Sequence, residues 1–220
     1  MKKNISRYLA LSFVFFGLFL VLNASVPIVQ YEIFSLSQLS PGELLSPVPK
    51  PEVRGLATET YNLTRASNWF IGQPDLPIVS SKVKYYNISI PRLGIKDATV
   101  EIGGEDLSKS LIHYSGTSLP GQQGNAVIFG HSSLPQFFSP TNYLTIFTKL
   151  PSLKKGDDVF VEYDGIKYTF RVEQMFEVKP TDIQVLEQRY DDSYLTLVTC
   201  VPPGTYIKRL VVKARIIPKT

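Results

Sequence analysis

An uncharged run from Tyr8 to Tyr31, rich in Leu, Phe and Val, follows three basic residues among the first seven. A helix of this length and composition can cross a hydrocarbon core of about 30 Å. Basic residues that precede a span favour a cytoplasmic N-terminus, so the rest of the chain would lie outside the cytoplasm. We therefore expect a cytoplasmic tail at residues 1–7 and an uncleaved, single-pass transmembrane anchor at 8–31.

A cleaved signal peptide is the alternative interpretation of this segment. Its apolar core is usually about 7–15 residues and is followed by a cleavage site of the Ala-x-Ala kind. Here the run is longer, and its small residues, Asn23-Ala24-Ser25, lie inside it. These two features favour the anchor.

The next fifty residues, 32–81, contain many prolines and little periodicity, which is typical of a stalk. Within it, Tyr61-Asn62-Leu63 and Asn68-Trp69-Phe70-Ile71 are too apolar for a pure linker. We expect these segments either to pack on the following domain or to form a lid over its site.

Residues 82–220 are long enough for one hydrophobic core and are predicted to be mainly β. Asp164-Gly165 is a strong two-residue hairpin signal. About seven or eight short strands favour a barrel or a sandwich. The expected strands include 84–90, 98–102, 125–130, 158–163, 166–178, 195–199 and 207–217, and short helical pieces are expected at 106–112, 141–150 and 181–188.

The chain contains a single cysteine, Cys200, which ends the apolar and β-branched run 195–199. Outside the cytoplasm paired cysteines usually form disulfides, and one cysteine cannot form an internal bridge. Cys200 is therefore either a small buried hydrophobic residue or a residue kept for its reactivity. Taken alone, its spacing favours the first interpretation.

Two further polar residues lie at ends of expected strands. His131 closes the run 125–130, and Arg209 opens the β-branched run 210–212. A thiol, an imidazole and a guanidinium can together supply a nucleophile, a proton carrier and an anion stabiliser for acyl transfer. His113 is the rival imidazole, and we interpret it as structural or loop-lining because it lies between an expected helix and a loop.

The composition argues against several other functions. With only two histidines, a zinc site of the usual multi-His or Cys-rich kind is not expected. The net charge of +4 is too small and too dispersed to indicate nucleic-acid binding, and the Gly-rich segments lack the context of a phosphate loop. The acidic pairs Asp157-Asp158 and Asp191-Asp192 are expected to be solvated turn residues. We predict no cofactor and no metal.

Around these residues the chain resembles the sortases, which are membrane-anchored cysteine transpeptidases of bacterial surfaces. Thr-Leu-Val-Thr-Cys at 196–200 matches the family's Thr-Leu-x-Thr-Cys signature, Gly130-His131 matches its strand-end histidine, and Arg209 has the expected spacing. Leu119-Pro120-Gly121-Gln122-Gln123-Gly124-Asn125 and Lys154-Lys155-Gly156-Asp157 are also similar to family segments. The resemblance covers roughly residues 82–217 and makes an inert Cys200 much less favoured.

The resemblance implies an eight-stranded β-barrel that recognises a Leu-Pro-x-Thr-Gly-like sorting signal near the C-terminus of a secreted protein. Cys200 would form a thioacyl intermediate, His131 would donate and accept the proton, and Arg209 would bind the substrate carbonyl or the oxyanion. The acyl group would pass to an amine of the cell wall or of a pilin. The implied partners are thus the secreted substrate, the amine acceptor and the membrane.

Three questions stay open at this point. A hydrolytic cysteine peptidase with the same residues, or a non-catalytic anchored β-domain, would have the same sequence features. The subclass is also open: pilus-building sortases usually carry a C-terminal membrane span and a lid with an Asp-Pro-aromatic plug. This sequence ends at Thr220 without a second span, and 69–75 has the lid elements in another order.

Overall fold

The computed structural model describes residues 2–41, 64–70 and 81–218. The chain divides into two compact units, Met1–Gln38 and Leu39–Thr220. The first is one helix, α1 (Lys2–Gln38). Its segment Arg7–Leu36 has a mean hydropathy of 2.3 and is long and apolar enough to cross a membrane. A signal sequence near the N-terminus would meet the same criterion, so length and composition leave both interpretations in place.

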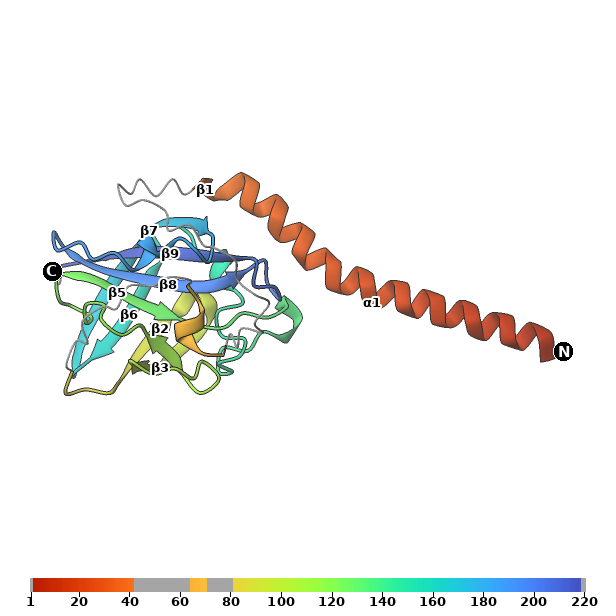
Figure 1. Ribbon diagram of the computed structural model, residues 1–220, viewed down its shortest axis with the longest axis horizontal. Helices are drawn as coiled ribbons and strands as arrows, with labels where there is room; N and C mark the ends of the chain where they lie inside the picture. The colour runs from red at the N-terminus through yellow and green to blue at the C-terminus, as the bar shows by residue number, and fades with distance from the viewer. Residues whose placement is uncertain (1, 42–63, 71–80, 219–220) are drawn as a thin grey trace. The chain divides into compact units, whose positions relative to one another are not determined.

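The second unit is a closed β-barrel (Figure 1). Its strands follow the order β7-β6-β2-β3-β4-β5-β8-β9, and a β7–β9 pairing closes the ring. A two-residue strand, β1 (Ser40–Pro41), pairs with β7 from outside the ring. The eight strands of the ring are β2 (Tyr85–Ile90), β3 (Ile95–Ile102), β4 (Leu111–His113), β5 (Gly124–Phe129), β6 (Asp158–Tyr163), β7 (Ile166–Val178), β8 (Ser193–Val201) and β9 (Lys208–Ile216).

The sequence explains why these segments become strands. β6 and β7 meet at Asp164-Gly165, where both residues have positive φ angles, 51° and 74°, as a two-residue hairpin turn of this type requires. β5 and β8 are neighbouring parallel strands of the ring and are buried along almost their whole length. Burial on both faces explains why their sequences are largely apolar or β-branched and do not alternate apolar with charged residues.

The prediction of short helices is largely wrong. Part of the segment expected as a helix at 106–112 forms β4. Residues 141–149 make turns, and the segment 181–188 contains only a 3₁₀ turn, η5 (Ile183–Leu186). Further 3₁₀ turns are η1 (Ala66–Asn68), η2 (Pro91–Leu93), η3 (Pro135–Phe137) and η4 (Leu150–Ser152).

Most of the expected stalk, including Tyr61-Asn62-Leu63, lies outside the described residues. Of its described residues, 32–38 continue α1 and Ser40–Pro41 form β1, whereas the segment 64–70 packs on the barrel. Arg65 forms a β-bridge with Asp106, and Trp69 and Phe70 belong to the same core cluster as Phe129 and Cys200. The described residues of this apolar segment therefore contribute to the core of the barrel.

Candidate active site

Cys200 and Arg209 lie opposite each other on the antiparallel strands β8 and β9. Directly paired residues of two strands project on the same face of the sheet, so the thiol and the guanidinium are neighbours. Both side chains are buried, with 5% of Cys200 and 2% of Arg209 exposed. The strands therefore bring together two of the three residues that the sequence singled out.

His131 follows β5 after one intervening residue, Gly130, and the parallel pairing of β5 with β8 places Phe129 beside Val198. Gly130 continues this ladder, because its N–H donates to the carbonyl of Val198 (3.1 Å). Extending the register by one more residue on each strand places His131 beside Cys200. The three strand-end residues thus gather at one end of the barrel, as their positions in the sequence predict.

A glycine before His131 is required by packing. A Cβ atom at Gly130 would lie 2.5 Å from side-chain carbons of both Leu111 and Phe147, which is closer than real Cβ contacts. The hydroxyl of Thr199, the residue before the nucleophile candidate, donates to the Gly130 carbonyl (2.8 Å). The Gly-His and Thr-Cys pairs are therefore held against each other.

Trp69, which is completely buried, covers this end of the barrel. Its indole stacks on Phe129 (ring centroids 5.3 Å apart, 13° between planes) and packs against the His131 ring at 5.9 Å. The Arg209 guanidinium carbon lies 5.4 Å from the indole centroid, and Nε of Arg209 donates to the Trp69 carbonyl (3.3 Å). Nη1 of Arg209 donates to the carbonyl of Tyr206 (2.9 Å).

Burial dominates the electrostatics of the site. It raises the pKa of the Cys200 thiol, an effect that the positive charge of Arg209 partly opposes. It also lowers the pKa of His131, an effect that the negative charge of Asp106 partly opposes. Both shifts favour a neutral thiol beside a neutral imidazole near pH 7. Nε2 of His131 is buried and has no hydrogen-bond partner among the described residues.

His113 lies at the end of β4, away from the thiol. Both of its ring nitrogens contact other side chains of the barrel. Its Nδ1 is 2.8 Å from the Tyr86 hydroxyl, and its Nε2 is 3.1 Å from the Thr117 hydroxyl. Because Thr117 donates its own proton to the Tyr114 carbonyl, Nε2 of His113 carries the hydrogen and Nδ1 accepts from Tyr86. Burial lowers the pKa of His113 to about 4.

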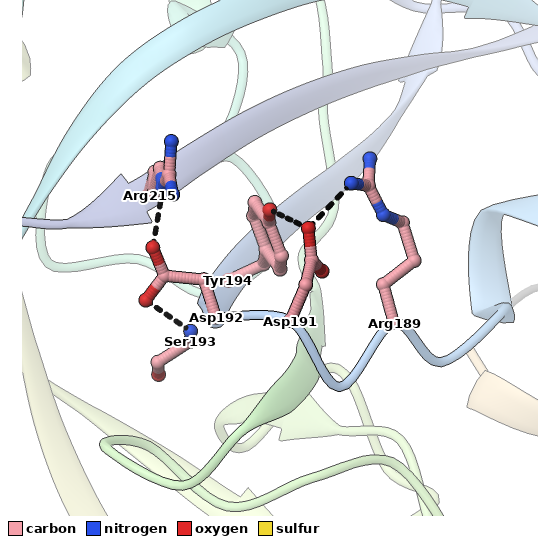
Figure 2. A network of polar contacts seen from close by, with 6 residues as sticks. All are labelled: Arg189, Asp191, Asp192, Ser193, Tyr194 and Arg215. Carbon is pink, nitrogen blue, oxygen red and sulfur yellow. Dashed lines mark hydrogen bonds and ion pairs between the residues drawn. The ribbon is translucent and has the colours of Figure 1, made fainter.

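The acidic pairs have arginine partners. Asp191 accepts from Nη2 of Arg189 (2.6 Å), and Asp192 accepts from Nε of Arg215 (2.5 Å), as Figure 2 shows. Asp158 is bonded to Arg171 in the same way, through Nε (2.8 Å) and Nη2 (3.1 Å). Across residues 2–41, 64–70 and 81–218, no group of three or more His, Cys, Asp or Glu side chains could hold a metal ion.

These features describe a closed β-barrel that brings a buried thiol, an imidazole and a guanidinium together at one end. The sequence matches the model of the sortase domain family over residues 88–217. The chain therefore belongs to the sortase family, and the expected eight-stranded barrel is confirmed.

Individual relatives agree with this assignment. Sortase A of Staphylococcus aureus is 34% identical over 132 residues, which are 58% of this chain and 60% of that protein. Sortase A of Bacillus anthracis is 29% identical over 64% of this chain and 66% of its own length. The chain thus spans less than two thirds of either relative. A lid mutant of sortase A from Corynebacterium diphtheriae superposes with a TM-score of 0.55 at 26% identity, over 64% of this chain and 74% of that one.

Proposed function

We propose that this chain is a sortase-type cysteine transpeptidase that cleaves a Leu-Pro-x-Thr-Gly-like sorting signal and transfers the acyl product to an amine. The observation that supports this most directly is the register pairing of Cys200 with Arg209, with His131 at the end of the adjacent strand. The substrates would be secreted proteins that carry the signal, and the acceptor an amine of the cell wall or of a pilin. The match to the family over 88–217 supports the same activity.

The first half-reaction starts from the neutral pair. His131 takes the proton of the Cys200 thiol, and the thiolate attacks the carbonyl carbon of the Thr–Gly bond. Arg209 stays protonated and donates to the oxyanion that forms, because a guanidinium cannot act as a base in this range. The C–N bond breaks, His131 returns the proton to the departing Gly amine, and a thioester remains on Cys200.

The second half-reaction reverses these roles. An incoming amine attacks the thioester carbonyl while His131 accepts its proton, and the C–S bond breaks. The proton then passes to the Cys200 sulfur, which restores the thiol and the neutral imidazole. A hydrolase would use water in place of the amine, so the two functions differ only in the acceptor.

We also propose that residues 64–70 are a lid. The Trp69 carbonyl accepts from Nε of Arg209, which is the kind of bond that a substrate carbonyl would make with this residue. The Trp69 ring also packs on His131, and Cys200 is only 5% exposed. A peptide could reach the thiol only after this segment moves. A lid is named in the solved Corynebacterium diphtheriae relative.

For the cell, we propose that α1 anchors the protein in the membrane as a single span with a cytoplasmic N-terminus. The basic residues before the apolar segment support this orientation, which would place the barrel outside the cytoplasm. The single cysteine is consistent with that compartment, because it leaves no partner for an unwanted internal disulfide.

The test uses the full-length protein in detergent micelles, a Leu-Pro-x-Thr-Gly peptide and a range of oligoglycine and lysine amines. Mass spectrometry should find a peptide–amine product that wild-type protein forms and Cys200→Ala protein does not. A cleaved acid formed at the same rate with and without amine would identify a hydrolase. Absence of both products, together with a thiol that stays unlabelled after Trp69→Ala, would indicate a non-catalytic domain.

A further inference from the structure

The segment that carries His131 separates from strand β8 next to Cys200, at the candidate active site. The Gly130 N–H makes the last backbone bond from this segment to β8. After that residue, the chain is held by bonds of other kinds. The His131 carbonyl accepts from the Phe147 N–H (3.0 Å), and the Ser133 N–H donates to the Thr148 hydroxyl (2.9 Å).

Between them, the Ser132 hydroxyl donates to the carbonyl oxygen of Cys200 at 2.6 Å. This bond differs from the others because it joins the residue after the imidazole directly to the backbone of the residue that carries the thiol. The bonds to Phe147 and Thr148 fix the segment to a loop, whereas this one fixes it to β8 itself. It therefore acts on the distance between the His131 ring and the Cys200 sulfur.

The side chain of His131 has few other restraints. Its Nε2 has no hydrogen-bond partner in the part of the chain that the structure describes, and its ring packs against Trp69. Under the lid proposal that packing is lost when the site opens. The position of the imidazole during the reaction then depends on how firmly its own backbone is held beside Cys200.

We propose that Ser132 is a positioning residue, whose hydroxyl holds the His131 imidazole at proton-transfer distance from the Cys200 thiol. This inference rests on the proposed function, because it assumes that these two groups exchange a proton. Ser132 needs no contact with the substrate for this role. Misplacement of a reacting group by about 1 Å can cost up to about 100-fold in rate, so the loss of one backbone tether is expected to be visible in kcat.

The test compares four full-length proteins in detergent: wild type, Ser132→Ala, Ser132→Thr and Ser133→Ala. The last is the matched control, because it removes a neighbouring hydroxyl while the N–H that bonds Thr148 remains. With a sorting-signal peptide and an amine, Ser132→Ala is expected to lower kcat about 10-fold with KM within twofold of wild type. Ser132→Thr should recover most of the rate, and Ser133→Ala should lose little.

A second measurement does not require turnover. The rate of Cys200 alkylation by iodoacetamide is followed against pH, since only the thiolate reacts. A neutral imidazole held beside the sulfur can donate its N–H to the thiolate and favour it, so Ser132→Ala should move the midpoint of alkylation to higher pH and Ser132→Thr should restore it. This readout separates the positioning role of Ser132 from the proposed transpeptidase function, because the alkylation midpoint can be measured whether or not the protein transfers a peptide.

The positioning role is overturned if Ser132→Ala keeps both kcat and the alkylation midpoint of wild type. It is also overturned if Ser132→Thr fails to recover the rate, because the hydroxyl is then not the active feature. A fall in melting temperature that parallels the fall in kcat, in Ser132→Ala and Ser133→Ala alike, would show a general structural effect and refute the proposal.

Discussion

Glu105 is the surface residue that we expect to hold the lid segment 64–70 closed. Its carboxylate Oε2 accepts from both the N–H (3.2 Å) and the hydroxyl (2.8 Å) of Ser67. Nε of Arg65 lies 3.7 Å from the same oxygen. Glu105→Ala removes these contacts and leaves the backbone bond from the Ala66 N–H to the carbonyl of residue 105 in place.

The size of the effect follows from the exposure of these groups. Hydrogen bonds to a charged acceptor contribute about 1.5–3 kcal/mol each when buried, but exposed pairs contribute far less because water competes. We take about 1–1.4 kcal/mol for the contacts of Glu105 with Ser67 and Arg65 together. Their loss in Glu105→Ala corresponds to about a 5- to 10-fold larger population of the open state. The barrel keeps its own core, so its melting temperature should change little.

Labelling of Cys200 measures this population directly. The chain contains one cysteine, so the intact mass after reaction with iodoacetamide reports a single site. When opening is fast relative to labelling, the rate is proportional to the open fraction, and Glu105→Ala should label about 5 to 10 times faster than wild type. The matched control is Glu101→Ala, which removes a nearby carboxylate that pairs with Lys84 at 3.3 Å and not with the lid.

Equal labelling rates for the Glu105 and Glu101 variants would show that Glu105 does not hold the segment. Trp69→Ala provides the second arm, because this fully buried indole must leave the core if the segment moves. Truncation of such a side chain typically costs about 3–5 kcal/mol in the packed state, so labelling should accelerate by more than 100-fold. A thiol that labels at the wild-type rate in both variants would refute the lid.

The remaining predictions concern the site and its support. Cys200→Ala should abolish cleavage and transfer while the melting temperature is retained, as peptide assays and thermal unfolding would show; turnover above about one hundredth of wild type would contradict a covalent intermediate. Arg209→Lys should be nearly as inactive as Arg209→Ala, because Lys keeps the charge but not the planar set of donors; a near-normal rate would indicate a simple charge effect. His131→Ala should lose about 10²–10⁴ in rate and His113→Gln only a little, and the reverse result would overturn the assignment of the proton carrier. His113, whose pKa is about 4 in the fold against an ordinary 6.5, is neutral when folded and takes up a proton on unfolding between these values. The free energy of unfolding should therefore fall as pH falls through this window, by about 2 kcal/mol between pH 7.5 and pH 5, and urea titrations should find a smaller fall in His113→Gln.

Much of the barrel is predictable because its strands carry local signals. The bounds of β6 and β7 follow directly from the Asp164-Gly165 turn between them. β4 is missed because it has only three residues and depends on pairing with β3 and β5 at once. No periodicity can be measured over so short a segment.

The expected helices fail because side chains compete for backbone groups. The Asp106 carboxylate accepts from both the N–H and the hydroxyl of Ser108, which closes a turn where a helix was expected. The Asn142 side chain accepts from the Leu144 N–H in the same manner. Such local bonds favour turns, and an apolar spacing alone does not reveal them.

Part of the candidate site could be predicted from the sequence and part could not. Cys200, His131 and Arg209 are predictable as strand-end residues because parallel and antiparallel pairing brings neighbouring strand ends together. The contact of Trp69 with Arg209 joins residues 140 positions apart, and no local pattern encodes it. The available signal was the apolar segment Asn68-Trp69-Phe70-Ile71 inside a stretch that otherwise had the composition of a linker.

Burial links the chemistry of the site to the lid. With Trp69 in place, desolvation keeps the Cys200 thiol protonated and the His131 imidazole neutral, so the resting site contains a weak nucleophile. Departure of the segment would free Nε of Arg209 and admit water, and both changes favour the thiolate. Under the proposed function, a substrate that displaced the lid would meet a free Arg209 donor and a more reactive Cys200 thiol at the same time. The same contacts that protect the thiol at rest would then determine when it can react.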